Sequence, residues 1–190
     1  MNRSTIIILL LFIYLSNNAQ ERKAYITHYQ FDSIPSCNCS NDELKENSAI
    51  ILRERTIADY FHNDKGALEM NFIYHKTIKL LTDKSVDEYN KIYVPLYDVT
   101  EIIDIRARFI SKEGKITEVE KTDMKPVENL EESGNYKVFA IVGAETGGII
   151  DYYYIIRKAP LTIGHTTLQS KLPTCNVELK LITPSTLKLV

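Results

Sequence analysis

The residues of this 190-residue chain best suited to nucleophilic chemistry are its cysteines and one histidine. A cysteine nucleophile needs a histidine that holds it as a thiolate, and usually a third group that orients the histidine. His165 and Cys175 form the only such pair that is close in sequence, but no acidic residue stands where it would complete a triad. We interpret Cys175 as a small hydrophobic side chain or half of a disulfide. An enzyme that uses Cys175 and His165 is the third of three functional hypotheses.

The other two cysteines, Cys37 and Cys39, are separated by one residue, which is too close for an unstrained bridge between them. One of them could form a disulfide with Cys175 across a long loop, and the sequence leaves open which. A pair with this spacing could also bind a metal, but no second pair and no histidine cluster accompanies it. We therefore predict neither a metal site nor a cofactor.

The four histidines are scattered without the spacing of metal ligands. His62 falls in a polar turn, and His75 falls with Thr77 on the polar side of a predicted strand, so we interpret both histidines as surface side chains. Acidic residues do not cluster as a calcium-binding loop. Carboxylate pairs for glycoside hydrolysis cannot be assigned from sequence separation. We predict no catalytic residue in the chain.

Aromatic residues are unevenly distributed by type, with twelve Tyr, six Phe and no Trp. Three tyrosines are consecutive, Tyr152, Tyr153 and Tyr154. Alternation along a strand places Tyr152 and Tyr154 on one face and Tyr153 on the other. Tyr152 and Tyr154 are therefore the candidate residues for a surface that binds a glycan or a peptide.

The elements that position these side chains are predicted to be strands. Apolar and charged residues alternate from Ile103 to Phe109, and Gly114 lies in the turn to a second strand that starts at Ile116, which is typical of a hairpin with one buried and one solvated face. Pro95 interrupts another strand and predicts an edge or a bulge. Further strands are predicted over residues 24–31, 49–60, 67–82, 92–97, 136–142, 149–156, 163–169 and 177–183.

Many short strands separated by turns predict an all-β fold, an antiparallel β-sandwich that is extended and built in one or two parts. Helical structure is limited to short turns near residues 42–47 and 83–90. The domain organisation follows from this pattern: an N-terminal strand and loop over residues 21–48, and a β-sandwich domain over residues 49–190. Because apolar residues still alternate at 187–190, we expect this domain to be incomplete at its C-terminus.

Residues 1–20 have the layout of a secretory signal peptide. Arg3 precedes the apolar run Ile6–Leu15, and a short polar stretch then ends at Ala19 and Gln20. The run is shorter than the ~20 residues needed to span a bilayer. We predict export to the periplasm, the cell surface or the medium, with no transmembrane segment after cleavage. The net charge of −2 gives no electrostatic reason to expect a nucleic-acid partner.

The segment from about Ile50 to Pro160 resembles a bacterial extracytoplasmic domain of unknown function that precedes a transglutaminase-like domain in secreted proteins of Bacteroidetes type. The likeness lies in ILRERTIADY, YHKTIKLLTDKSVDEYNKIYVPLYD, IRARFISKEGKITEV and KVFAIVGAETGGIIDYYYIIRKAP. The resemblance implies a β domain that accompanies a core with a Cys-His-Asp triad. None of Cys37, Cys39 and Cys175 sits where the cysteine of that triad would be.

Two further functional hypotheses follow. The first is a non-catalytic β domain that positions a transglutaminase-like catalytic domain, or that binds the protein or peptide substrate of that domain. The alternative is a stand-alone module that binds a glycan or a peptide through Tyr152 and Tyr154.

Overall fold

The computed structural model describes residues 26, 28–38, 45–119, 125–127, 136–160 and 171–187, with the backbone alone over 125–127. The chain divides into two compact units, Met1–Ser33 and Ile34–Val190. In the first unit, the described residues 26 and 28–33 contain no strand, so the strand expected over 24–31 is not seen there. All the strands described below belong to the second unit.

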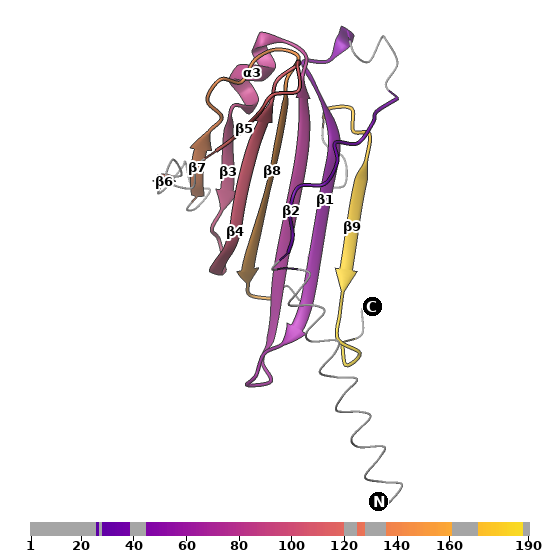
Figure 1. Ribbon diagram of the computed structural model, residues 1–190. Coiled ribbons are helices and arrows are strands. Elements are labelled where there is room, and N and C mark those ends of the chain that lie inside the picture. Colours follow the sequence, from indigo (N-terminus) through magenta and orange to yellow (C-terminus); the bar gives the residue numbers. More distant parts are fainter. Residues whose placement is uncertain are drawn as a thin grey trace, which may run out of the picture. The chain divides into compact units, whose positions relative to one another are not determined.

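Six strands form a large sheet in the order β5-β4-β8-β2-β1-β9 (Figure 1). Neighbouring strands are antiparallel except at one edge, where β9 runs parallel to β1. Parallel strands cannot be joined by a short hairpin, and β1 and β9 are separated in the chain by all the other strands. The strands are β1 (Ala49–His62), β2 (Leu68–Leu80), β4 (Val99–Ile110), β5 (Ile116–Glu118), β8 (Ile149–Lys158) and β9 (Val177–Ile182).

A smaller antiparallel sheet has the strand order β3-β7-β6. Its strands are β3 (Lys91–Pro95), β6 (Lys125–Val127) and β7 (Tyr136–Ala140). Because β3 is an edge strand, Pro95 at its end does not interrupt the hydrogen bonding of a central strand.

The segment between β2 and β3 folds as helix α3 (Asp83–Tyr89), where the sequence predicted a helical turn. Thr82 is the N-cap: its hydroxyl accepts a hydrogen bond from the Ser85 amide, and the Ser85 hydroxyl oxygen accepts one from the Thr82 amide. This reciprocal capping satisfies amide groups that the first helical turn leaves without partners.

The hydrophobic core lies between the two sheets. Ile92 and Val94 from β3 and Phe139 from β7 belong to the same buried cluster as Phe109 and Ile150 of the large sheet. The all-β, sandwich-like prediction is therefore confirmed, with the parallel β1–β9 pair as the departure from a purely antiparallel fold.

The predicted hairpin forms between β4 and β5, and Gly114 in its turn has a φ of +85°, a conformation that glycine adopts without steric cost. On its apolar side, Ile105, Ala107 and Phe109 are buried as expected. The opposite side is not simply solvated, because the side chain of Arg108 is only 14% exposed and contacts a buried carboxylate.

Candidate functional site

The register of β2 against β8 assigns side chains to the two faces of the large sheet. Tyr154 lies opposite Tyr74, and Tyr153 lies opposite His75. Directly opposite residues share a face, so Tyr152 and Tyr154 lie on one side with Tyr74, while Tyr153 lies on the other side with His75. We call these sides the tyrosine face (Tyr74, Tyr152, Tyr154) and the ionic face (His75, Thr77, Arg108, Asp151, Tyr153).

Asp151 is the centre of the ionic face. Its Oδ1 lies 2.9 Å from His75 Nε2 and accepts a hydrogen bond of 2.7 Å from the Thr77 hydroxyl. Its Oδ2 accepts a hydrogen bond of 2.9 Å from Arg108 Nε, and Arg108 Nη2 forms an ion pair with the same oxygen at 2.8 Å. Because His75 and Thr77 are on β2, Asp151 on β8 and Arg108 on β4, the cluster joins three adjacent strands.

The charge state of Asp151 follows from these contacts. Burial by itself would raise the pKa of this carboxyl group, since its side chain is 0% exposed. The hydrogen bond and charge of His75, the hydrogen bond from Thr77 and the charge of Arg108 outweigh that effect, so the pKa of Asp151 is lowered. The cluster therefore holds a carboxylate at neutral pH.

The hydrogen-bonded cluster continues towards the edge formed by β4 and β5. The ring of Tyr153 meets the ring of His75 edge to face, with 5.7 Å between centroids. The Tyr153 hydroxyl donates to Asp104 Oδ2 at 3.2 Å, and Arg106 Nε donates to the same oxygen at 3.2 Å. Thus the charged side of the predicted hairpin is part of an ion network rather than a row of separate surface charges.

His75 is fully buried, which corrects the prediction that it is a surface residue. Alternation shows that two sets of residues face opposite ways, but it does not show which set meets solvent. A signal for the cluster was present in the sequence: Asp151 is the one charged residue within the stretch Ile149–Ile156. A buried carboxylate requires charged or hydrogen-bonding partners. In a sheet, such partners come from the residues that lie opposite it on the neighbouring strands.

A histidine–aspartate pair is part of many catalytic triads, but this cluster has a different arrangement. In a triad the histidine stands between the acid and the nucleophile. Here the Thr77 hydroxyl donates to Asp151 directly, beside the histidine rather than beyond it. The two described cysteines, Cys37 and Cys175, are bonded to each other. The arrangement holds strands together by charge and shows no activated nucleophile among the described residues.

The tyrosine face contains a group of packed rings. Tyr74 lies 5.4 Å from Tyr154 and 6.2 Å from Tyr152 between ring centroids. The Tyr74 hydroxyl donates to Glu54 Oε1 at 2.6 Å, and Lys76 Nζ lies 3.4 Å from the same oxygen. Burial raises the pKa of all three tyrosines above the ordinary value, so their hydroxyl groups stay protonated.

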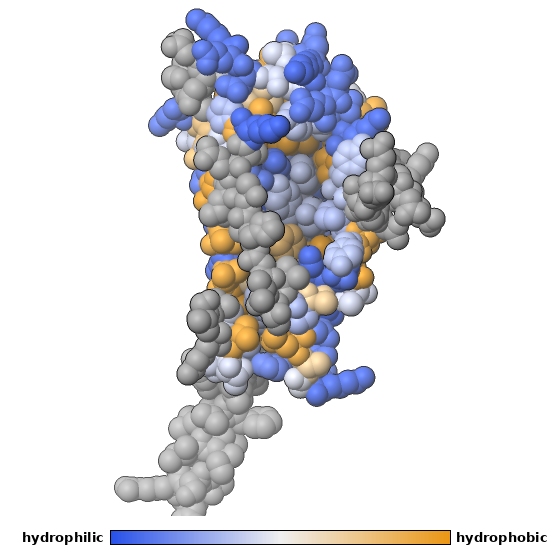
Figure 2. Space-filling view, turned by 180° about the vertical axis from the view of Figure 1, so that it is seen from behind, coloured by the Kyte–Doolittle hydropathy of each residue, from blue (hydrophilic) through white to orange (hydrophobic). Residues whose placement is uncertain are grey.

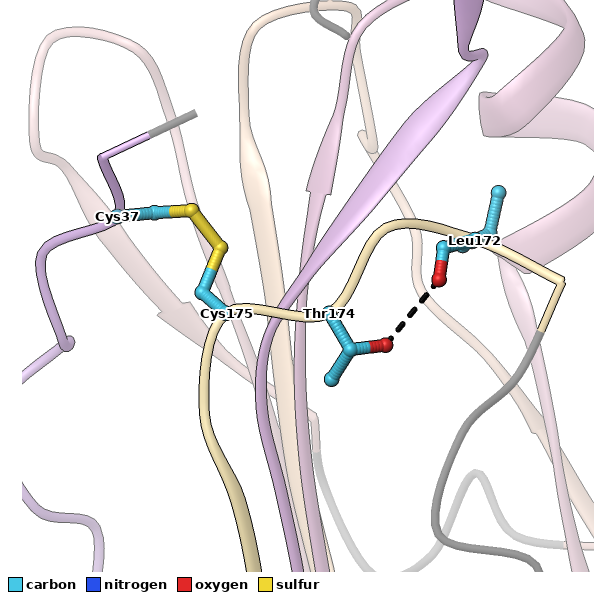
Figure 3. Close-up of a disulfide and its surroundings, with 4 residues drawn as sticks. All are labelled: Cys37, Leu172, Thr174 and Cys175. Atoms are coloured by element: carbon cyan, nitrogen blue, oxygen red, sulfur yellow. Dashed lines mark hydrogen bonds between the residues drawn. A yellow bond between two sulfur atoms is a disulfide. The ribbon is translucent and has the colours of Figure 1, made fainter. Parts of the chain in front are cut away.

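A disulfide joins Cys37 to Cys175, with 5.6 Å between their Cα atoms (Figure 3). Of the two partners that the sequence left open for Cys175, the structure has Cys37, and Cys39 lies outside the described residues. Cys175 lies just before β9, and its amide donates to the carbonyl of Ile51 at 2.9 Å. The hypothesis of a Cys175 nucleophile is therefore wrong for this structure, since the sulfur is bonded. His165 lies outside the described residues.

The described residues contain no group of three or more His, Cys, Asp or Glu side chains placed to hold a metal ion. They also contain no helix that is both long enough and apolar enough to cross a membrane.

Comparison with known proteins gives a matching family and similarity to solved structures. The model of a domain of unknown function with a solved structure (DUF3857) matches residues 68–190. The crystal structure of a proposed protease from Parabacteroides distasonis ATCC 8503 has a similar fold, with a TM-score of 0.50 at 14% identity over 73% of this chain. This chain spans only 29% of that protein's length. No curated protein matches the chain.

Proposed function

We propose a non-catalytic, accessory role for this chain, which belongs to the DUF3857 family of domains of unknown function. In this role the chain positions a transglutaminase-like catalytic domain, or holds the protein substrate of that domain. Its environment would be extracytoplasmic, where a disulfide such as Cys37–Cys175 forms and persists.

The observation that carries the proposal is that the polar groups around Asp151 are buried and bonded to one another within the sheet. Both oxygens of this buried carboxylate accept hydrogen bonds, from His75 and Thr77 on one side and from Arg108 on the other. Catalytic acids and bases must reach a substrate, whereas His75 and Asp151 are both 0% exposed. The constellation that looks most like catalytic machinery therefore serves the sheet, which supports an accessory role.

The second support is the size of the similar protein. The fold shared with the Parabacteroides distasonis protein corresponds to 29% of that chain, and that protein is described as a proposed protease. Together with the resemblance of residues 50–160 to domains that precede a transglutaminase-like core, this agrees with a β domain that works beside a catalytic domain.

The proposal is tested by an activity assay of the full chain. Purified under oxidising conditions, the chain should neither hydrolyse peptides nor transfer amines to glutamine side chains. Turnover that persists after repurification and is lost in Cys175→Ala or His165→Ala would overturn the accessory role.

A genomic reading provides the complementary test. The DNA that follows codon 190, or the neighbouring gene, should encode a domain with a Cys-His-Asp triad, and that domain should bind the purified chain. Failure to find or bind such a domain would count against the proposed partner.

A second candidate function is a module that binds a glycan or a peptide. Tyr154 is only 7% exposed, which corrects its prediction as a binding residue, so the partly exposed Tyr152 is the candidate contact on the tyrosine face. A tyrosine ring provides apolar contact area together with a hydroxyl group. On glycan and peptide arrays, binding that is lost in Tyr152→Ala would support this function. Tyr93→Ala is the matched control, since Tyr93 is an exposed tyrosine on β3 of the other sheet. Equal loss in both variants would contradict it.

A further inference from the structure

β9 is the outermost strand in the order of the large sheet, and β1 is its one neighbour among the described strands. Figure 1 shows β9 at the margin of the sheet. Three apolar side chains on this strand are unusually accessible: Val177 is 40% exposed, Leu179 41% and Leu181 51%. In the view from behind, apolar side chains gather along the margin where β9 lies (Figure 2). An edge strand with an apolar side is a site at which another strand can add.

We propose that two copies of this chain associate through β9, with the two strands antiparallel about a two-fold axis at Leu179. The two large sheets would then form one continuous sheet. This interface goes beyond the proposed accessory role and does not depend on it.

The first five residues of β9, Val177-Glu178-Leu179-Lys180-Leu181, are complementary to themselves in this register. With Leu179 opposite Leu179 of the second copy, Val177 lies opposite Leu181, and Glu178 lies opposite Lys180. Each of these pairs occurs twice because the interface is symmetric. Opposite charges and apolar residues that face each other across two strands both stabilise the pairing.

Neighbouring registers lack this complementarity. A shift that brings Lys180 opposite itself, or Glu178 opposite itself, places like charges directly across the two strands, which is unfavourable. A shift by a single position places apolar residues opposite charged ones, because the side-chain period is two. Charge complementarity therefore selects both a second copy as the partner and Leu179 as the centre.

The neighbours of β9 within the chain are compatible with this interface. Leu179 lies opposite Thr56 of β1, which in turn lies opposite Tyr74 of β2, so the apolar side of β9 extends the tyrosine face. On the other side, Glu178 Oε2 accepts a hydrogen bond from Arg55 Nε at 2.6 Å, while the Glu178 side chain remains 45% exposed. A carboxylate has enough lone pairs to accept from Arg55 and from Lys180 of the second copy at once.

The experiment measures the dimer dissociation constant of the full chain by sedimentation equilibrium in non-reducing buffer. The wild type should dimerise, and Glu178→Lys should weaken the dimer roughly tenfold or more, because two attractive pairs become repulsive. The double variant Glu178→Lys/Lys180→Glu restores both pairs with the charges exchanged and should dimerise like the wild type. Added salt should reduce the difference between the single variant and the double variant.

A matched control separates the interface from the contact within the chain. Arg55→Gln removes the Arg55–Glu178 pair but leaves β9 unchanged, so its dissociation constant should stay within about twofold of the wild type, since exposed pairs contribute little to stability. Circular dichroism confirms that each variant is folded. A chain that stays monomeric, a dimer insensitive to Glu178→Lys, or a folded double variant that is monomeric would overturn the proposal.

Discussion

The two faces of the large sheet are built from the same strands, yet they bury their side chains in different ways. On the tyrosine face, Tyr74 and Tyr154 pack ring against ring, beside a core of aliphatic residues. On the ionic face, His75 contacts Asp151, whose charge is balanced by Arg108, and the ring of Tyr153 packs against His75. The tyrosine face depends on apolar contact area, whereas the other side of the sheet combines buried apolar residues such as Ile73 and Ile155 with the hydrogen-bonded charges around Asp151.

The polar side of a strand therefore does not always face solvent. His75, Thr77 and Asp151 are each 0% exposed, although all three are polar and alternate with apolar residues. An apolar cluster tolerates the loss of one contact gradually, whereas a buried ion network becomes unfavourable when one partner is removed. The two faces should therefore respond very differently to small changes.

The largest effect should follow from Asp151→Ala. This change removes the carboxylate that accepts hydrogen bonds from both His75 and Arg108, and it leaves these two groups without that partner. The loss should lower the unfolding free energy by about 3–5 kcal/mol. Denaturant unfolding monitored by circular dichroism measures this loss. A cost below about 1 kcal/mol would show that the ionic face is solvated and would remove the contrast between the faces.

Acid should weaken the same cluster by protonating the carboxyl group without removing it. Since the folded-state pKa of Asp151 is lowered, its contribution to stability is present above the unfolded-state pKa of about 4 and is lost as the pH falls through the folded-state pKa. The difference in unfolding free energy between the wild type and Asp151→Asn should be constant near neutral pH and should shrink below about pH 4. If the difference in unfolding free energy stays the same down to pH 3, protonation of Asp151 does not weaken the cluster and the prediction is wrong.

Overpacking should destabilise the apolar side to an intermediate extent. A Cβ added at Gly148 would overlap the buried ring of Phe109 and come within 3.1 Å of the Ile110 carbonyl oxygen. Gly148→Ala should therefore cost about 1–3 kcal/mol, measured as a lower denaturation midpoint. The double variant Gly148→Ala/Phe109→Leu should be less destabilised than the sum of the single variants. If the stability costs of Gly148→Ala and Phe109→Leu simply added, the Phe109 ring would not be what opposes a larger side chain at position 148.

Within the two faces of the large sheet, the smallest effect should come from Tyr74→Phe. This change removes the hydroxyl that donates to Glu54, but Lys76 still lies 3.4 Å from that carboxylate, so the expected cost is about 1 kcal/mol. Tyr93→Phe, at an exposed tyrosine of β3, should change stability by less than about 0.5 kcal/mol. If Tyr74→Phe were as costly as Asp151→Ala, the tyrosine face would also depend on a polar network.

The strands of the large sheet were predictable because local alternation and turn residues encode them. The prediction for residues 149–156 agrees with β8 (Ile149–Lys158), and Gly114 marks the turn of the hairpin between β4 and β5. The separation of Tyr153 from Tyr152 and Tyr154 followed from the same period of two. The partners of Asp151 could not be derived in this way, because they lie 74 and 76 residues before it and 43 residues before it in the chain.

From local alternation and turn residues alone, the amino-acid sequence indicated the strands of the large sheet and the side chains of each strand that face the same way, whereas the strand expected over 24–31 is absent from the described residues and β6 was not predicted. The tertiary structure decided that His75 is buried against Asp151, that Cys37 joins Cys175, and that β9 lies parallel to β1. These outcomes depend on strand order and register, which result from packing between segments distant in sequence. The same alternation therefore leads to a tyrosine cluster on one face and to a buried carboxylate on the other.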